Sequence, residues 1–103
     1  MPRLIWSEAS QRDIVKIDRF LDEHNPRAAA RIARAIRATA IRLVEYPRIG
    51  RPFDGQLRIL GVRRTPYLVF YRVREEVVEI ARIRHFSEDW AGLSLLDRPE
   101  IEP

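Results

Sequence analysis

A group of basic, aromatic and imidazole side chains near the ends of the predicted strands is the part of the sequence best suited to chemistry. The group comprises Arg63, Arg64, Tyr67, Arg82, Arg84, His85 and Trp90. Arginine can hold a phosphate, histidine can transfer a proton near neutral pH, and an aromatic ring can stack on a base. These are the candidate binding residues, and a catalytic role would fall on Arg82, Arg84 and His85. The alternative is structural, with Arg82 and Arg84 covering a sheet face, His85 capping the strand end and Trp90 packing in the core or at an edge.

Other kinds of site have little support in the sequence. The four glycines, at positions 50, 55, 61 and 92, are too scattered for a nucleotide-binding loop. His24 and His85 are far apart and no HExxH pair is present, so we predict no metal site. No serine lies in a GxSxG motif, and the lack of Cys excludes disulfides and a thiolate nucleophile. We therefore expect no cofactor.

Two amphipathic helices precede the strands that would position these residues. The first is predicted over residues 7–23, after a short strand at residues 2–6, with Ser7 as its N-cap. The second begins at Asn25-Pro26 and runs to about Glu45. Apolar residues recur at helical spacing in both, namely Ile14, Ile17, Phe20 and Leu21 in the first and Ala29, Ile32, Ile36, Ala40 and Leu43 in the second. Arginines 27, 31, 34 and 42 fall on the opposite side of the second helix, and the short connection predicts a helical hairpin.

Three strands follow a loop that is predicted at residues 46–56. They are expected at residues 56–63, 67–73 and 77–86, and the middle one, apolar on both sides, is expected to be central. The resulting fold class is α+β with the order βααβββ, a helical hairpin packed on a small antiparallel sheet. Residues 1–90 are predicted to form a single domain and residues 91–103 a loosely ordered tail.

Charge is distributed unevenly along the chain. Of the 19 basic residues, 18 are arginine, and Lys16 is the only lysine. Residues 27–51 carry seven Arg against one Glu, whereas residues 88–103 carry five acids against one Arg. A basic middle segment favours an anionic partner, either an acidic protein or a nucleic acid. With no apolar run long enough for a membrane span or a secretory signal, a cytoplasmic location is expected.

Several short motifs, in their order and spacing, resemble the RelE/ParE superfamily of toxins from type II toxin–antitoxin systems. The resemblance covers roughly residues 3–90. Its motifs are Trp6-Ser7, Asn25-Pro26 with Ala28-Ala29, Tyr46-Pro47-Arg48-Ile49-Gly50-Arg51, Pro66-Tyr67-Leu68-Val69-Phe70-Tyr71-Arg72-Val73, Ile80-Ala81-Arg82-Ile83-Arg84-His85 and Asp89-Trp90. The superfamily's fold, a helical hairpin against a compact antiparallel sheet, agrees with the elements predicted above.

The same fold carries two unrelated toxic activities, so membership does not by itself define the function. RelE-like and YoeB-like members cut mRNA in the ribosomal A site, whereas ParE-like members poison DNA gyrase and have no nuclease chemistry. The ribonucleases begin their central strand with an arginine, and this chain has Tyr67 there. YoeB ends on a His-Tyr pair, and this chain has His85-Phe86.

Two further departures concern the loop before the sheet. At the position of the YoeB carboxylate this chain has Phe53, and Asp54 is one residue away. The lysines of RelE could be replaced here only by arginines, namely Arg48, Arg51 and Arg58. ParE-like chains commonly have an aromatic residue or His in place of the missing arginine and a His after the last strand. The resemblance therefore favours a ParE-like inhibitor of DNA gyrase that acts by binding rather than as an enzyme.

Two other functions remain open at this level. One is a ribosome-dependent mRNA endoribonuclease, with the ribosome and mRNA as partners and Arg82, Arg84 and His85 as phosphate and proton-transfer groups. The other is a non-toxic remnant that only binds an antitoxin. In each case the resemblance implies a cognate antitoxin in a hetero-oligomer, encoded on a chromosome or as a plasmid stabilisation system. Acidic residues of its tail are expected to meet the basic 27–51 segment and Arg63-Arg64.

Overall fold

Each helix begins at a side chain that caps its first turn. In the computed structural model, which describes residues 2–87, Ser7 Oγ accepts a hydrogen bond from the Ser10 N–H (3.0 Å) at the start of helix α1 (Glu8–His24). Asn25 Oδ1 accepts from the Ala28 N–H (3.2 Å) at the start of helix α2 (Pro26–Glu45), whose first residue is proline. Caps of this kind satisfy backbone donors that have no partner within the helix. Both predicted helices are thus confirmed to within one residue.

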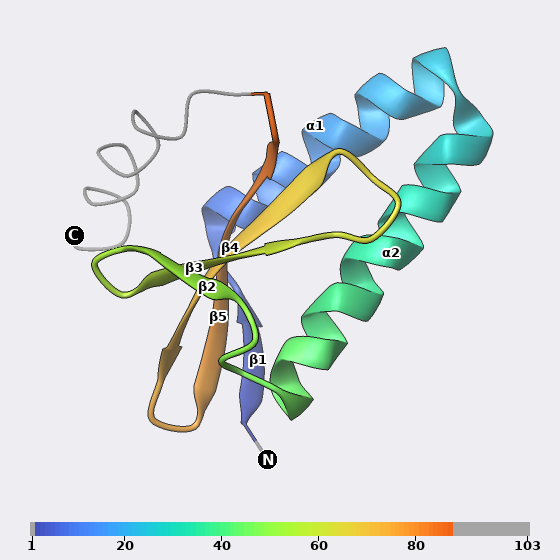
Figure 1. The fold of residues 1–103 in the computed structure, drawn as a ribbon. Coiled ribbons are helices and arrows are strands. Elements are labelled where there is room, and N and C mark those ends of the chain that lie inside the picture. Colours follow the sequence, from blue (N-terminus) through green and yellow to red (C-terminus); the bar gives the residue numbers. More distant parts are fainter. Residues whose placement is uncertain (1, 88–103) are drawn as a thin grey trace.

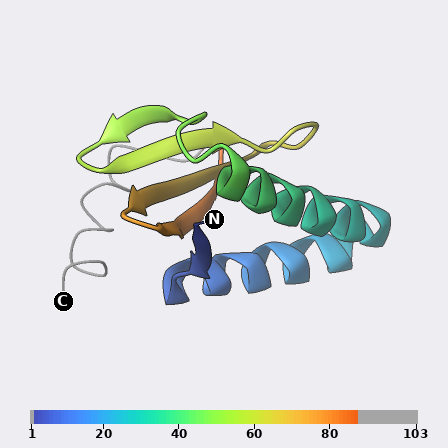
Figure 2. The same ribbon diagram turned by 90° about the horizontal axis from the view of Figure 1, so that it is seen from below.

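Five strands form a single sheet in the spatial order β1-β5-β4-β3-β2. Their bounds are β1 (Arg3–Trp6), β2 (Arg51–Asp54), β3 (Leu57–Gly61), β4 (Tyr67–Arg74) and β5 (Val77–His85). Strands β2 to β5 pair antiparallel, and β1 pairs parallel with β5. Both helices lie on one side of this sheet, as Figure 1 and the turned view in Figure 2 show.

The predicted fold class is confirmed, and the sheet differs from the prediction in two details. The sheet is mixed rather than wholly antiparallel, because β1 and β5 run in the same direction. The two helices and strands β2 to β4 lie between them in the sequence. Residues 51–54, predicted as loop, form the short edge strand β2, which accommodates Pro52 because an edge strand has one side that needs no backbone donor. Strand β4 is the central strand, as predicted.

The main core lies between α2 and the sheet. The five apolar residues predicted to face the core from α2 are all buried, and four of them, all but Ala29, belong to this cluster together with Tyr71 and Val69 of β4. Ile14, Ile17 and Leu21 of α1 pack against its margin. Phe20 does not join this apolar stripe, because its side chain is 57% exposed and stacks on His24 with ring centroids 4.3 Å apart.

A close backbone approach at Gly50 holds the loop after α2 against the central strand. The Gly50 N–H donates to the Tyr71 hydroxyl (2.9 Å), and the Arg58 Nη1 donates to the Gly50 carbonyl (2.7 Å). A Cβ atom at position 50 would lie 2.6 Å from the Tyr71 hydroxyl oxygen, so the contact requires glycine. Burial raises the pKa of Tyr71, against smaller opposing effects of the Gly50 hydrogen bond and of Arg58 and Arg48.

The predicted tail over residues 91–103 and the candidate Trp90 lie outside the described residues. Within residues 2–87, neither helix is long and apolar enough to cross a bilayer.

Candidate functional site

The end of strand β5 and the start of strand β4 bring two of the candidate residues together. Tyr67 and His85 are directly opposite in the register, and their rings meet edge to face with centroids 5.5 Å apart. The Phe86 ring stacks on the His85 ring, with the two ring centroids 5.0 Å apart. The Ser87 backbone N–H donates to His85 Nδ1 (3.2 Å), and the Ser87 hydroxyl oxygen lies 2.8 Å from the same nitrogen. Because Nδ1 is an acceptor here, a neutral His85 carries its proton on Nε2.

A groove of about 420 Å³ opens beside this pair, between α1 and the sheet. We call it the α1 groove. Its lining residues are Asp13, Lys16, Ile17, Phe20, Tyr67, Ile83, Arg84 and His85. Three of these, namely Tyr67, Arg84 and His85, are candidates that sequence analysis named, and the structure brings them together. The groove combines apolar walls with cationic groups, so it suits a ligand that carries both apolar groups and negative charge.

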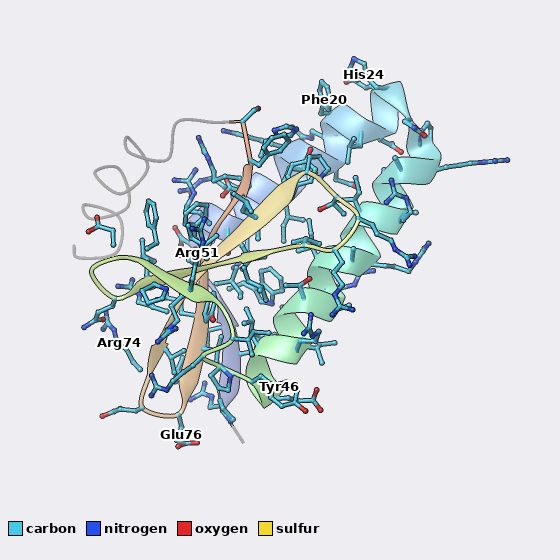
Figure 3. The ribbon with its side chains drawn as sticks, viewed as in Figure 1. Phe20, His24, Tyr46, Arg51, Arg74 and Glu76 are labelled. Carbon is cyan, nitrogen blue, oxygen red and sulfur yellow. The ribbon has the colours of Figure 1, made fainter. Side chains whose placement is uncertain are left out.

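Helix α1 contributes residues to this groove that were not among the predicted site residues. Lys16 and Phe20 are four residues apart and therefore share one side of the helix, next to Ile17. Figure 3 shows Phe20 and His24 adjacent near the end of α1. The spacing of Lys16 and Phe20 could have indicated that they share one side of α1. The strand that they approach lies some 65 residues later along the chain, and local spacing does not encode such a tertiary contact.

Arg82 occupies a different environment from Arg84 and His85. Its Nε and Nη2 donate to the two carboxylate oxygens of Asp13, at 2.8 and 3.1 Å. Both side chains are largely buried, at 12% and 7% exposure. The Ile83 N–H donates to the same carboxylate at 3.0 Å. Arg82 is therefore engaged in joining α1 to β5, which corresponds to the structural alternative rather than to an open phosphate-binding arginine.

Arg63 and Arg64 lie in the turn between β3 and β4 and face α2 instead of the α1 groove. They line a second groove of about 320 Å³ together with Ala35, Ala38, Thr39 and Arg42. The Arg31 Nη1 donates to the Arg64 carbonyl at 3.0 Å, which ties this turn to α2. The described candidate residues are thus divided between the α1 groove and this second groove, and Arg82 lines neither of them. Across residues 2–87, no three His, Asp or Glu side chains are grouped so as to hold a metal ion.

Comparisons with known proteins agree with this architecture. A family model described as the ParE toxin of the type II toxin–antitoxin system parDE matches residues 4–90. Toxin RelE2 of Caulobacter vibrioides is 35% identical over 85 residues, which cover 82% of this chain and 96% of that protein. The putative toxin Y4kP of Sinorhizobium fredii is 32% identical over 91 residues, covering 85% and 92% of the two chains.

One solved structure is similar over the same region. A chain of the chromosomal ParDE toxin–antitoxin system from P. aeruginosa superposes with a TM-score of 0.73 at 25% identity, covering 82% of this chain and 96% of that one.

Proposed function

The chain belongs to the ParE toxin family of type II toxin–antitoxin systems, and we propose that it acts by binding and inhibiting DNA gyrase in the cytoplasm. In this proposal the toxin traps gyrase on cleaved DNA and performs no chemistry of its own. As a toxin of this class it has a cognate antitoxin as partner, which neutralises it.

The observation that carries this proposal is the engagement of Arg82 by Asp13. A ribonuclease of this fold needs several groups in register, including a cation that holds the scissile phosphate and groups that move protons. Here the Arg82 guanidinium is directed onto a buried carboxylate, with both Asp13 oxygens within 3.1 Å of its nitrogens. Strand β4 begins with Tyr67, whose ring packs against His85. These arrangements support a binding role for the α1 groove.

We further propose that the antitoxin neutralises the toxin by covering the α1 groove. Ile17 and Phe20 offer apolar contacts, and Lys16 and Arg84 add positive charge to the groove's lining. An amphipathic segment with acidic and apolar side chains matches both features. Since Tyr67 and His85 line the same groove, such a segment would cover the residues that we assign to target binding.

An endoribonuclease is the second candidate, because Arg84 and His85 line one groove. In that reading Arg84 holds the phosphate and His85 transfers the proton, which contributes typically about 10²–10⁴-fold in rate. A gyrase inhibitor would lose only one polar contact if His85 were replaced, worth about 1 kcal/mol. The two candidates therefore differ in their dependence on this imidazole.

The experiment compares wild type with His85→Gln, which keeps a hydrogen-bonding side chain but cannot titrate. We expect wild-type protein to inhibit supercoiling by purified gyrase and to leave translation in a purified system running. His85→Gln should still arrest growth when it is expressed. His24→Gln, which alters the exposed histidine at the end of α1, is the matched control. Codon-specific cleavage of mRNA in the ribosomal A site, lost in His85→Gln, would establish the endoribonuclease instead.

A further inference from the structure

The outer side of helix α2 and the adjoining turn carry a concentration of arginines that the proposed function does not use. We call this surface the arginine face, and its members are Arg27, Arg31, Arg34, Arg42, Arg63 and Arg64. Five of the six are classed as exposed and Arg42 is half-buried. Within residues 2–87 none of them forms an ion pair with a carboxylate. The charge of this face is therefore available to an external anion.

The arginines are arranged along a rigid rod. Helix α2 has 20 residues, and the distance along its axis from Arg27 to Arg42 is about 22 Å at 1.5 Å per residue. In Figure 3, side chains tipped with nitrogen project from the outer side of α2, away from the sheet. A linear array of cations on a straight helix matches a ligand that repeats its negative charge along a line.

The β3–β4 turn adds a second row of cations in a fixed position. Arg64 adopts a left-handed backbone conformation (φ 62°), and its carbonyl accepts from Arg31 Nη1 at 3.0 Å. The Thr65 hydroxyl donates to the Val62 carbonyl at 2.9 Å and accepts from the Tyr67 N–H at 3.1 Å. These hydrogen bonds order the backbone of the turn, from which Arg63 and Arg64 line the groove of about 320 Å³ together with Arg42 of α2. The groove thus has cations on both rims.

The floor of this groove is small and apolar. It is formed by Ala35, Ala38 and Thr39, and the Thr39 hydroxyl is directed inward, where it donates to the Ala35 carbonyl at 2.9 Å. A sugar–phosphate backbone alternates a charged phosphodiester with a compact sugar. Cationic rims over a floor of methyl groups suit this alternation, because the phosphates can meet the guanidinium groups while the sugars contact the floor.

The chemistry of the face favours duplex DNA over other polyanions. Single strands are bound through exposed aromatic side chains, and none belongs to the arginine face as the structure describes it. Duplex RNA is read through contacts to its 2′-hydroxyls, and the hydroxyls of Thr39 and Thr65 beside this face both donate to carbonyls within the protein. Peptides are bound through a free strand edge or a deep apolar groove, and a continuous helix surface offers neither.

We propose that the arginine face binds the phosphate backbone of duplex DNA without sequence preference. In this proposal the guanidinium groups contact phosphate oxygens rather than base edges, and none of the face's members is an Asn or Gln that could read adenine. The sequence predicts that the basic 27–51 segment and Arg63-Arg64 meet acidic residues of an antitoxin tail, and for the six arginines of this face we propose DNA as the partner instead. It is independent of the identity of the toxin's target, because it concerns binding to DNA alone.

The test measures binding of the full chain to a labelled duplex of about 20 base pairs between about 50 and about 200 mM salt. The variant Arg34→Gln/Arg42→Gln/Arg63→Gln leaves the Arg31–Arg64 hydrogen bond in place. We expect its affinity for DNA to fall at least about tenfold. Its plot of log affinity against log salt should become shallower by about 2 to 3, since each phosphate contact contributes about 0.9. Circular dichroism confirms that the variant is folded.

A matched control removes the same charge from other elements. Arg3→Gln/Arg19→Gln/Arg74→Gln replaces three exposed arginines of β1, α1 and β4, and we expect less than about threefold loss of affinity. Equal losses in the two variants would contradict the proposal, as would failure of wild type to bind duplex DNA at low salt. Single-stranded DNA or duplex RNA of equal length binding as tightly as duplex DNA would also overturn it. So would an acidic peptide whose binding, unlike that of DNA, depends on the three arginines.

Discussion

The Asp13 carboxylate accepts from two donors on β5, the Arg82 guanidinium and the Ile83 N–H. The Ser7 hydroxyl, at the start of the same helix, donates to the Ala81 carbonyl at 2.8 Å. Strand β1 pairs only with residues 77–80 of β5. Beyond the end of β1, the Ser7 and Asp13 side chains form hydrogen bonds with the backbone of β5 at Ala81 and Ile83. A few residues of α1 thus satisfy the exposed edge of a strand that would otherwise have unpaired backbone groups.

Removing one member of the buried Asp13–Arg82 pair should be costly. Asp13→Ala leaves the guanidinium and the Ile83 N–H without their acceptor, and loss of one partner of a buried pair typically costs about 3–5 kcal/mol. We expect a clear decrease in the midpoint of chemical denaturation. Asp18→Ala, at an exposed position of the same helix, should change stability by less than about 0.5 kcal/mol. Similar midpoints for the two variants would show that the pair does not stabilise α1 against β5.

Helix α2 has a buried apolar side and an exposed side that carries arginines. Its buried side includes Ile32, Ile36 and Leu43, which lie in the main core, and its outer side contributes four members of the arginine face. The 3.6-residue period of the helix produces this division directly from the sequence. One side therefore stabilises the fold, and the other side is free to be changed without unfolding it.

Substitutions on the two sides of α2 should have opposite outcomes. Ile36 is 2% exposed, so Ile36→Asp would bury a carboxylate without a partner and should unfold or aggregate the protein. Arg34→Glu, on the exposed side, should leave the thermal midpoint nearly unchanged. Thermal melts of both variants provide the measurement, and equal tolerance of the two changes would contradict the assigned faces.

The helices were predictable because their signals are local, whereas other elements depend on distant partners. Ser7, Asn25-Pro26 and the apolar period define both helices to within a residue. The edge strand β2 was missed because its four residues contain Pro52 and pair only through β3. The parallel direction of β1 was also unpredictable, since its partner β5 begins 71 residues after β1 ends, from Trp6 to Val77.

The candidate site was predictable only in part for the same reason. The register between β4 and β5 brings Tyr67 and His85 together, as expected from neighbouring strands that share a hairpin. The pairing of Arg82 with Asp13 spans 69 residues, and no spacing in the sequence indicates it. Arg63 and Arg64 line a groove against α2 rather than the α1 groove, and this too depends on how the helical hairpin packs on the sheet.

On the scale of the whole molecule, the positive charge is almost independent of pH. Arginine accounts for 18 of the 19 basic residues and stays protonated throughout the range in which proteins are folded. Among the three tyrosines, Tyr71 is fully buried, and burial raises its pKa. We therefore expect the Tyr71 phenol to contribute to the dependence of stability on alkaline pH.

We expect stability to fall as the pH rises above about 10, the ordinary pKa of tyrosine. Burial raises the pKa of Tyr71, so above this pH the unfolded chain binds fewer protons than the folded one and is favoured. Tyr71→Phe should be less stable at neutral pH by about 1 kcal/mol, through loss of the Gly50 hydrogen bond, but should decline less between about pH 9 and about pH 11. Thermal melts of this variant and of Tyr46→Phe, at an exposed tyrosine, provide the comparison. An unchanged alkaline decline in Tyr71→Phe would exclude Tyr71 as its cause.

The parallel pairing of β1 with β5 also determines how late in synthesis the sheet and the α1 groove can be completed. Arg3 pairs with Val77 and Trp6 with Ile80, so β1 has no neighbour in the sheet until the ribosome has made most of the chain. The α1 groove has the same requirement, because Ile83, Arg84 and His85 form one of its walls. Contacts between residues so far apart form late and slowly. A nascent or prematurely terminated chain lacks the residues of this wall, so the α1 groove can assemble only after nearly complete translation.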